Sequence, residues 1–246
     1  MKFLRFLIRL AFVLPWVIFG LIMAGVVFHG LSATRRRQLH RSWSRVLMRV
    51  CGVRIVVQGE PCMSGPVFWV ANHVSWVDIF VLNSVRATAF VAKSEIRSWP
   101  VIGWLVAWAG TLFIERGQRH ALQAMAQAMQ QRFQAGDAVG LFPAGTTILG
   151  LELLPFHAAL FEPARMAGID IQPVALRYMQ DGRRSSFASF VGEETLVANM
   201  WRLLGATGVS VEVVYLPYLP IHNADGAVAS RQELSRRSHE AISAQL

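Results

Sequence analysis

The sequence predicts an α/β fold with a mostly parallel sheet and crossover helices, preceded by an N-terminal membrane helix or helix pair. The first observation is an apolar stretch, Leu10–Gly30, that holds no Asp, Glu, Lys or Arg. The second is that β-rich runs alternate with helical runs beyond it, as in parallel sheets whose strands are joined by helices. The third is a composition of 54% hydrophobic and 16% charged residues, which indicates contact with lipid.

The apolar stretch has about the length that a helix needs to cross a bilayer. Pro15 and Gly20 are expected to kink it or to break it into halves, so it either spans the membrane or dips into one leaflet and returns. Three arginines, residues 35–37, follow the stretch, and no convincing small-x-small cleavage site precedes them. We therefore expect a retained anchor and not a cleaved signal peptide.

Basic residues flank the anchor on both sides: Lys2, Arg5 and Arg9 before it, and Arg35, Arg36, Arg37, Arg41, Arg45 and Arg49 after it. The heavier cluster follows the anchor, which favours a location at the cytoplasmic face of the inner membrane. Because both flanks are basic, a spanning helix and a monotopic helix pair both stay open. The net charge of +9 predicts an anionic partner, and the anchor favours an anionic membrane over nucleic acid.

The next segment, Gln38–Val53, is predicted to be an amphipathic helix, since Trp43, Leu47 and Val50 recur at helical spacing between arginines. It ends the N-terminal part of the chain, residues 1–52. Cys51 and Cys62 form neither a CxxC pair nor a metal-spaced cluster, so we expect free thiols.

The α/β domain is expected over residues 53–222, followed by a peripheral tail with a weak helix over residues 223–246. The length of 246 residues suits one such domain with an appendage. The expected strands are Val53–Gln58, Val67–Ala71, Thr88–Val91, Thr111–Ile114, Ala138–Phe142, Ile171–Arg177 and Val209–Tyr215. The expected helices are Val77–Asn83, Ile102–Trp108, Ala121–Ala135 and Ala158–Ala167.

The polar segment Asn72–Asp78, with sequence NHVSWVD, directly follows the apolar strand Val67–Ala71. In one continuous helix, His73 and Asp78 would lie about 140° apart around the axis and could not readily meet. They can meet if His73 lies on the turn that leaves the strand and Asp78 lies early in the next helix, with Ser75 as a plausible cap. Open α/β sheets carry their sites at this position, beyond the carboxyl ends of strands.

Such a pair has a definite chemical use. Asp78 would hold the imidazole tautomer, and His73 would take a proton from an attacking hydroxyl. The alternative is a buried histidine beside an aspartate that begins a helix, and the HxxxxD spacing alone favours this alternative. The sequence has no GxSxG, GxxxxGK or GxGxxG motif, so serine-hydrolase and nucleotide-binding interpretations lose their main support.

Segment NHVSWVD resembles the NHxxxxD block of the glycerolipid acyltransferases, the family of 1-acylglycerol-3-phosphate acyltransferase. Three further segments resemble the family's other blocks in the same order: Gly110–Arg116, Phe142–Thr147 and Ile171–Leu176. The resemblance runs from about Arg54 to Tyr215. It implies a membrane enzyme of lipid metabolism and phospholipid biosynthesis, with His73 and Asp78 as the catalytic pair.

The resemblance also implies how substrates are held. Arg116 of the second block would bind the acceptor's phosphate, because arginine offers planar, bidentate donors. Gly145, Thr146 and Thr147 of the third block would help to bind the substrate, and backbone amides around Gly145 would stabilise the developing oxyanion. Asn72, which precedes the histidine in the first block, is a further candidate for substrate binding.

Lys93 follows the predicted strand Thr88–Val91 and is a candidate for the donor's phosphates or the acceptor's headgroup. A solvated lysine is an equally good interpretation. The histidines and cysteines form no ligand cluster, so no metal is predicted.

The implied reaction transfers a fatty acyl chain from acyl-CoA or acyl carrier protein to a lysolipid hydroxyl, without a cofactor. The acceptor implied first is 1-acylglycerol-3-phosphate, which would give phosphatidate. Thr147 stands where phosphate-handling members often carry arginine, so a lyso-ornithine lipid or another lysolipid is the alternative. Ala144 stands where the family's third block has glutamate, which leaves open a membrane-binding protein on this fold that has lost turnover.

Overall fold

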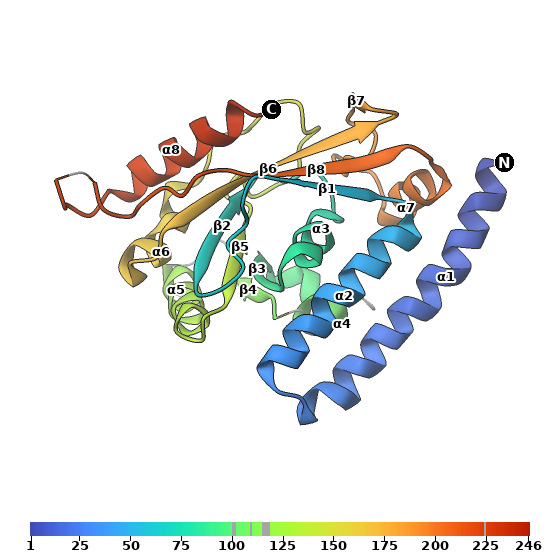
Figure 1. Ribbon diagram of the computed structural model, residues 1–246, viewed down its shortest axis with the longest axis horizontal. Helices are drawn as coiled ribbons and strands as arrows, with labels where there is room; N and C mark the ends of the chain where they lie inside the picture. The colour runs from blue at the N-terminus through green and yellow to red at the C-terminus, as the bar shows by residue number, and fades with distance from the viewer. Residues whose placement is uncertain (100–101, 109, 115–118, 224) are drawn as a thin grey trace.

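The computed structural model describes residues 1–99, 102–108, 110–114, 119–223 and 225–246 (Figure 1). Its centre is a sheet of eight strands in the order β1-β8-β6-β2-β5-β3-β4, with β7 paired to β6. The strands are β1 (Arg54–Gln58), β2 (Val67–Ala71), β3 (Thr88–Lys93), β4 (Leu112–Ile114), β5 (Ala138–Leu141), β6 (Ile171–Gln180), β7 (Arg183–Arg184) and β8 (Val209–Tyr215). Strand β6 pairs antiparallel with β7 and β8, and the other pairs are parallel. The predicted α/β class with a mostly parallel sheet is confirmed.

Helices surround this sheet. The longer ones are α1 (Lys2–Ile22), α2 (Ala33–Cys51), α3 (Asp78–Val85), α4 (Ile102–Trp108), α5 (Arg119–Gln134), α6 (Glu162–Ala167), α7 (Leu196–Gly205) and α8 (Arg231–Ser243). The short turns are the π-helical η1 (Met23–Val27) and the 3-10 helices η2 (Phe28–Gly30), η3 (Ser94–Ser98) and η4 (Ala158–Phe161).

Strand β2 shows why the sheet has two cores. Its side chains alternate between the two faces, as in any strand. Val67, Trp69 and Ala71 pack in the core formed with α1, α2, α3 and α7, whereas Phe68 and Val70 pack in the core formed with α5, α6 and α8. Both faces of β2 are covered, which accounts for its uninterrupted apolar sequence.

The N-terminal helices α1 and α2 lie side by side (Figure 1). The sequence predicts that Pro15 and Gly20 kink this segment or break it into halves. The break is not found, because α1 continues through both residues as an α-helix to Ile22. Gly20 instead allows close packing, because a Cβ atom there would lie 2.6 Å from the Trp43 ring. The indole N–H groups of Trp16 and Trp43 each donate to the other residue's carbonyl at 3.1 Å.

The first and last parts of the chain share the cores of the α/β domain. Val13 of α1 is buried in the first core. Leu234 and Ile242 of α8, from the segment expected to be peripheral, are fully buried in the second core.

Candidate active site

The candidate site begins where β2 ends. The last paired residue of β2 is Ala71, which lies opposite Val174 of β6. Asn72 extends this contact with its side chain: its oxygen accepts from the Leu176 amide at 2.7 Å, and its nitrogen donates to the Leu176 carbonyl at 3.0 Å. The Asn72 side chain is fully buried, so in our interpretation it fixes the start of the turn and does not contact a lipid directly.

The Asp78 carboxylate lies at the centre of the turn. One oxygen accepts from the amides of Val74 (2.7 Å) and Ser75 (2.9 Å), and the same oxygen lies 2.7 Å from His73 Nδ1. The other oxygen accepts from the Tyr178 hydroxyl at 2.5 Å. Asp78 is fully buried, and an ionised carboxylate is the form that accepts from every one of these donors.

Asp78 is also the first residue of α3, where a negative charge is favoured by the helix dipole. The expected cap at Ser75 was wrong, because α3 has Val77 as its N-cap and no side-chain cap bond. Ser75 contributes its backbone and not its side chain, since its amide donates to the Asp78 carboxylate. The result is a tight turn from the strand into the helix, and this turn places His73 and Asp78 in contact.

The contact with Asp78 determines the His73 tautomer. Because Nδ1 faces a carboxylate that can only accept, Nδ1 carries the proton and Nε2 is left with its lone pair. The His73 side chain remains 21% exposed. A ring nitrogen with a free lone pair at an accessible position is able to act as a general base.

Phe142 of the third sequence block fixes the plane of the His73 ring. The two rings stack with centroids 4.1 Å apart and planes 12° apart. Phe142 stacks in turn on Phe90 of β3, with centroids 5.4 Å apart. The imidazole therefore has its hydrogen bond to Asp78 in its own plane and an aromatic ring against one face.

Tyr178 is a site residue that the sequence analysis missed. It lies on β6, two residues beyond Leu176, and its hydroxyl is buried against Asp78. Burial, together with the neighbouring Asp78, raises the pKa of Tyr178 well above its ordinary value, so the phenol stays protonated and donates at neutral pH. A tyrosine two residues beyond the fourth block, on a strand that pairs with β2, was the available signal.

The third block forms a turn beside the first. Gly145 has φ +75°, in the left-handed region that favours glycine, and its amide donates to the Phe142 carbonyl at 3.0 Å. Thr146 is exposed. The Thr147 hydroxyl donates to the Phe190 carbonyl, while the Ile148 amide donates to the His73 carbonyl at 2.8 Å. Since the Gly145 amide is engaged, the expected oxyanion contact would have to come from another amide of this turn.

Two predicted binding residues cannot be placed at the site. Arg116 lies outside the described residues. Lys93 ends β3, but its side chain is not among those described. Across the described part of the chain, no group of three or more His, Cys, Asp or Glu side chains could hold a metal ion.

Comparison with known proteins gives concordant results. The sequence model of the family described as Acyltransferase matches residues 54–177. The chain is 37% identical over 245 residues to the lyso-ornithine lipid O-acyltransferase of Pseudomonas aeruginosa, covering 97% of this chain and 92% of that protein. It is 39% identical over 161 residues to the 1-acyl-sn-glycerol-3-phosphate acyltransferase of Neisseria gonorrhoeae, covering 64% of this chain and 63% of that protein.

A solved structure has the same fold. The 1-acyl-sn-glycerophosphate acyltransferase of Thermotoga maritima superposes with a TM-score of 0.64 at 19% sequence identity. The match covers 100% of this chain and 96% of that one. The N-terminal helices and the C-terminal helix are therefore part of the shared architecture.

Proposed function

The chain belongs to the acyltransferase family, and from this premise we propose that it is a membrane-bound O-acyltransferase whose acceptor is a lyso-ornithine lipid. That it is an enzyme of acyl transfer follows from family membership and from the names of its relatives. The proposal adds the acceptor, the donor and the roles of the residues. The donor in this proposal is a thioester, acyl-CoA or acyl carrier protein, and no cofactor takes part.

The observation that carries the mechanism is the hydrogen bond between His73 Nδ1 and Asp78. His73 Nε2 takes the proton of the acceptor hydroxyl while the hydroxyl oxygen attacks the thioester carbonyl. The tetrahedral oxyanion then collapses, the carbon–sulfur bond breaks, and the departing thiolate receives the proton from His73. Asp78 keeps the tautomer and stabilises the imidazolium between these steps. The acceptor supplies the nucleophile, so a serine or cysteine of the enzyme is not required.

The acceptor assignment rests on the extent of similarity and on Thr147. The lyso-ornithine lipid relative matches nearly the whole chain, whereas the 1-acyl-sn-glycerol-3-phosphate relative matches 64% of it. This reverses the order in which the sequence analysis ranks the two acceptors. Thr147 uses its hydroxyl to hold the Phe190 carbonyl and carries no charge toward a phosphate. The 39% identity to the Neisseria protein keeps 1-acylglycerol-3-phosphate as the second candidate.

A substrate panel tests the acceptor. Purified protein in detergent micelles is given labelled acyl-CoA or labelled acyl carrier protein, with lyso-ornithine lipid, 1-acylglycerol-3-phosphate or lysophosphatidylcholine as acceptor. Mass spectrometry then identifies the acylated lipid. We expect the highest kcat/KM with lyso-ornithine lipid. A higher kcat/KM with 1-acylglycerol-3-phosphate would overturn this acceptor and establish the second candidate.

Substitution of Thr147 should change acceptor preference. We predict that Thr147→Arg raises the ratio of 1-acylglycerol-3-phosphate to lyso-ornithine lipid turnover, because it adds a bidentate donor suited to phosphate. Thr147→Val is the matched control, since it loses the same hydroxyl bond to Phe190 without adding charge. Measured against Thr147→Val, an unchanged ratio in Thr147→Arg would place the headgroup away from this turn.

Membrane attachment is assigned to α1. Lys2–Gly30 is the one helix among the described residues that is long and apolar enough to cross a membrane. Arg5 and Arg9, near its start, donate to carbonyls at the end of α7, while Trp16 and Phe19 lie beside α2. A helix that crosses the bilayer would carry its first turns away from the body. Because α1 contacts the body along its length, we propose that it lies along one leaflet, at the cytoplasmic face of the inner membrane.

Labelling at the two ends of the apolar segment, at Lys2 in α1 and at Ala33, which begins α2, tests this arrangement. Lys2→Cys and Ala33→Cys are made separately in a Cys62→Ser background, in which the remaining Cys51 is buried. The proteins are bound to preformed vesicles and treated with a membrane-impermeant maleimide. We predict that both cysteines react before the vesicles are lysed. Protection of one end until lysis would show that the helix crosses the bilayer.

A further inference from the structure

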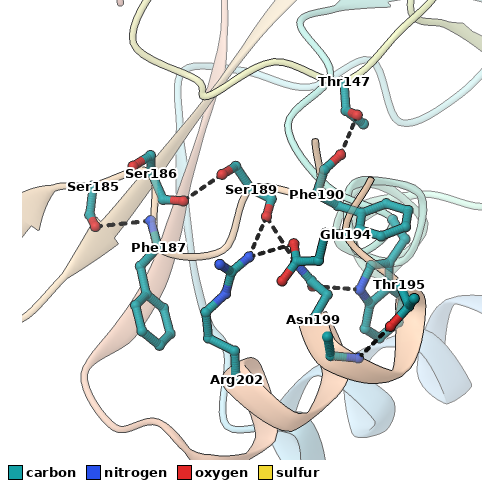
Figure 2. A network of polar contacts seen from close by, with 12 residues as sticks. Thr147, Ser185, Ser186, Phe187, Ser189, Phe190, Glu194, Thr195, Asn199 and Arg202 are labelled. Carbon is teal, nitrogen blue, oxygen red and sulfur yellow. Dashed lines mark hydrogen bonds and ion pairs between the residues drawn. The ribbon is translucent and has the colours of Figure 1, made fainter. Parts of the chain in front are cut away.

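Helix α7 joins the catalytic turns to the membrane helix (Figure 2 shows the first of these connections). The segment before α7, residues 185–195, forms a wall against the turns that carry His73 and Thr147, and we call it the wall segment. The Phe190 amide donates to the Val74 carbonyl at 2.9 Å, and the Phe190 carbonyl accepts from the Thr147 hydroxyl. One residue of the wall segment thus contacts both turns.

Side chains of α7 hold the wall segment in place. Asn199 and Arg202 lie three residues apart on one face of the helix, and both donate to the Ser189 carbonyl, at 2.8 and 2.6 Å. Both also donate to the Glu194 carboxylate, at 2.9 and 2.8 Å. These contacts leave Asn199 a single amide orientation, with its oxygen free to accept from another group.

That group belongs to the catalytic turn. Trp76 lies between His73 and Asp78 in the sequence, and its indole N–H donates to the Asn199 oxygen at 3.0 Å. Asn199 is fully buried, so this bond is shielded from water. Asn199 therefore connects the wall segment, α7 and the turn of the catalytic pair, although it is about 120 positions away in the sequence.

The other end of α7 is held by α1. Arg5 donates to the Gly205 carbonyl at 2.9 Å, and Arg9 donates to the carbonyls of Leu204 (3.0 Å) and Ala206 (2.6 Å). Cations at this end are favoured by the helix dipole and satisfy carbonyls that lack partners within the helix. The rings of Phe6 and Trp201 also pack together, with centroids 4.4 Å apart. Side-chain hydrogen bonds therefore connect α7 to the wall segment and, at its C-terminal end, to α1.

We propose that Asn199 is a positioning residue for acyl transfer, which acts through Trp76 to hold the turn that carries His73 and Asp78. This inference rests on the proposed function, since it concerns the geometry of that reaction. Asn199 does not touch the reacting atoms. Its effect arises because a small displacement of a general base from its reactive position strongly reduces the rate of the chemical step.

The first test is kinetic. Asn199→Ala should lower kcat by roughly 10- to 100-fold while the KM for the acyl donor and the fraction bound to vesicles stay unchanged. Leu203→Ala, which removes buried methyl groups from the same helix, is the control: it should lower the melting temperature but not kcat below the melting transition. Equal kcat in wild type and Asn199→Ala would overturn the proposal, as would an equal loss in Leu203→Ala.

A double-variant cycle tests whether Asn199 acts on the catalytic pair through Trp76. Trp76→Phe removes the indole donor and keeps an aromatic ring. If Asn199 acts through Trp76, the double variant Trp76→Phe with Asn199→Ala is no slower than Asn199→Ala alone. Losses that multiply in the double variant would contradict that route.

A spectroscopic measurement separates this proposal from the proposed function. The NMR signal of the His73 Nδ1 proton, hydrogen-bonded to Asp78, should be present in wild type and Leu203→Ala and lost or shifted in Asn199→Ala. It needs no turnover, so it applies even if the wild type acylates none of the lysolipids tested. An identical signal in Asn199→Ala would show that Asn199 does not position the pair.

Discussion

We expect His73→Ala to lower acyl transfer to the lysolipid by roughly 10²- to 10⁴-fold, the usual contribution of a general base. The physical reason is that His73 Nε2 is the group placed to take the acceptor's proton, because Nδ1 is held by Asp78. The side chain is partly exposed, so its loss should leave the protein folded and bound to membranes. Initial rates with saturating donor and acceptor, at matched protein concentration, measure the effect.

A second histidine supplies the control. His157 is exposed on the segment that follows the third block, and its amide donates to the Pro143 carbonyl at 3.1 Å. His157→Ala should keep the wild-type rate. A folded His73→Ala protein with the wild-type rate would rule out the general-base mechanism.

The second large effect is expected for Asp78→Asn. The carboxylate accepts from His73, Val74, Ser75 and Tyr178, and an amide offers one oxygen and an NH₂ group that cannot accept. We predict a loss of kcat of roughly 10²- to 10⁴-fold, because the imidazole loses its tautomer and its orientation. The free energy of unfolding should fall by about 1–3 kcal/mol, since buried donors lose their acceptor.

Tyr178→Phe distinguishes the two roles of the carboxylate. It removes the hydroxyl donor to Asp78 and leaves the bond to His73 in place. Thermal unfolding and kcat are measured for both variants. We predict a much smaller loss of kcat for Tyr178→Phe than for Asp78→Asn. Equal losses would mean that Asp78 acts mainly by holding the turn together.

The strands were predictable from local pattern. Strands β2 and β8 have the predicted bounds, Val67–Ala71 and Val209–Tyr215. Both are rich in β-branched and aromatic residues, which favour strands. Strand β2 is buried along its whole length, whereas in β8 the partly buried Ser210 and Glu212 alternate with buried residues. Helix α4 also has the predicted bounds.

Some helices were not predicted correctly. Helix α7 was missed, although Leu196–Gly205 carries apolar residues at helical spacing and Thr195 before it is a favoured N-cap residue, whose side chain accepts from the Ala198 amide. Helix α1 was expected to be kinked or broken at Pro15 and Gly20. This helix is unbroken and packs against α2 through Trp16, Gly20 and Trp43. Helix propensity takes no account of such tertiary contacts.

The candidate site, like the fold, was predicted only in part. The sequence places His73 and Asp78 on a strand-to-helix turn, and the structure brings them to 2.7 Å. Their catalytic roles stay predictions, as do the binding roles of Gly145, Thr146 and Thr147. Tyr178 reaches Asp78 only because β6 pairs with β2.

Phe142 and Asn199 likewise come to the catalytic turn from distant parts of the chain. Such contacts depend on strand order and helix packing, which the sequence pattern did not give.

The most direct test of the account follows one labelled acyl group. Purified protein is incubated with donor thioester carrying a labelled acyl chain, with and without the lysolipid acceptor, and the label is traced among free fatty acid, lipid and protein. The account predicts that thioester is consumed when acceptor is present, that the label appears in the acylated lipid, and that none is bound to the protein. Thioester loss at the same rate without acceptor, label fixed on the protein as an intermediate, or no transfer to any lysolipid would contradict it.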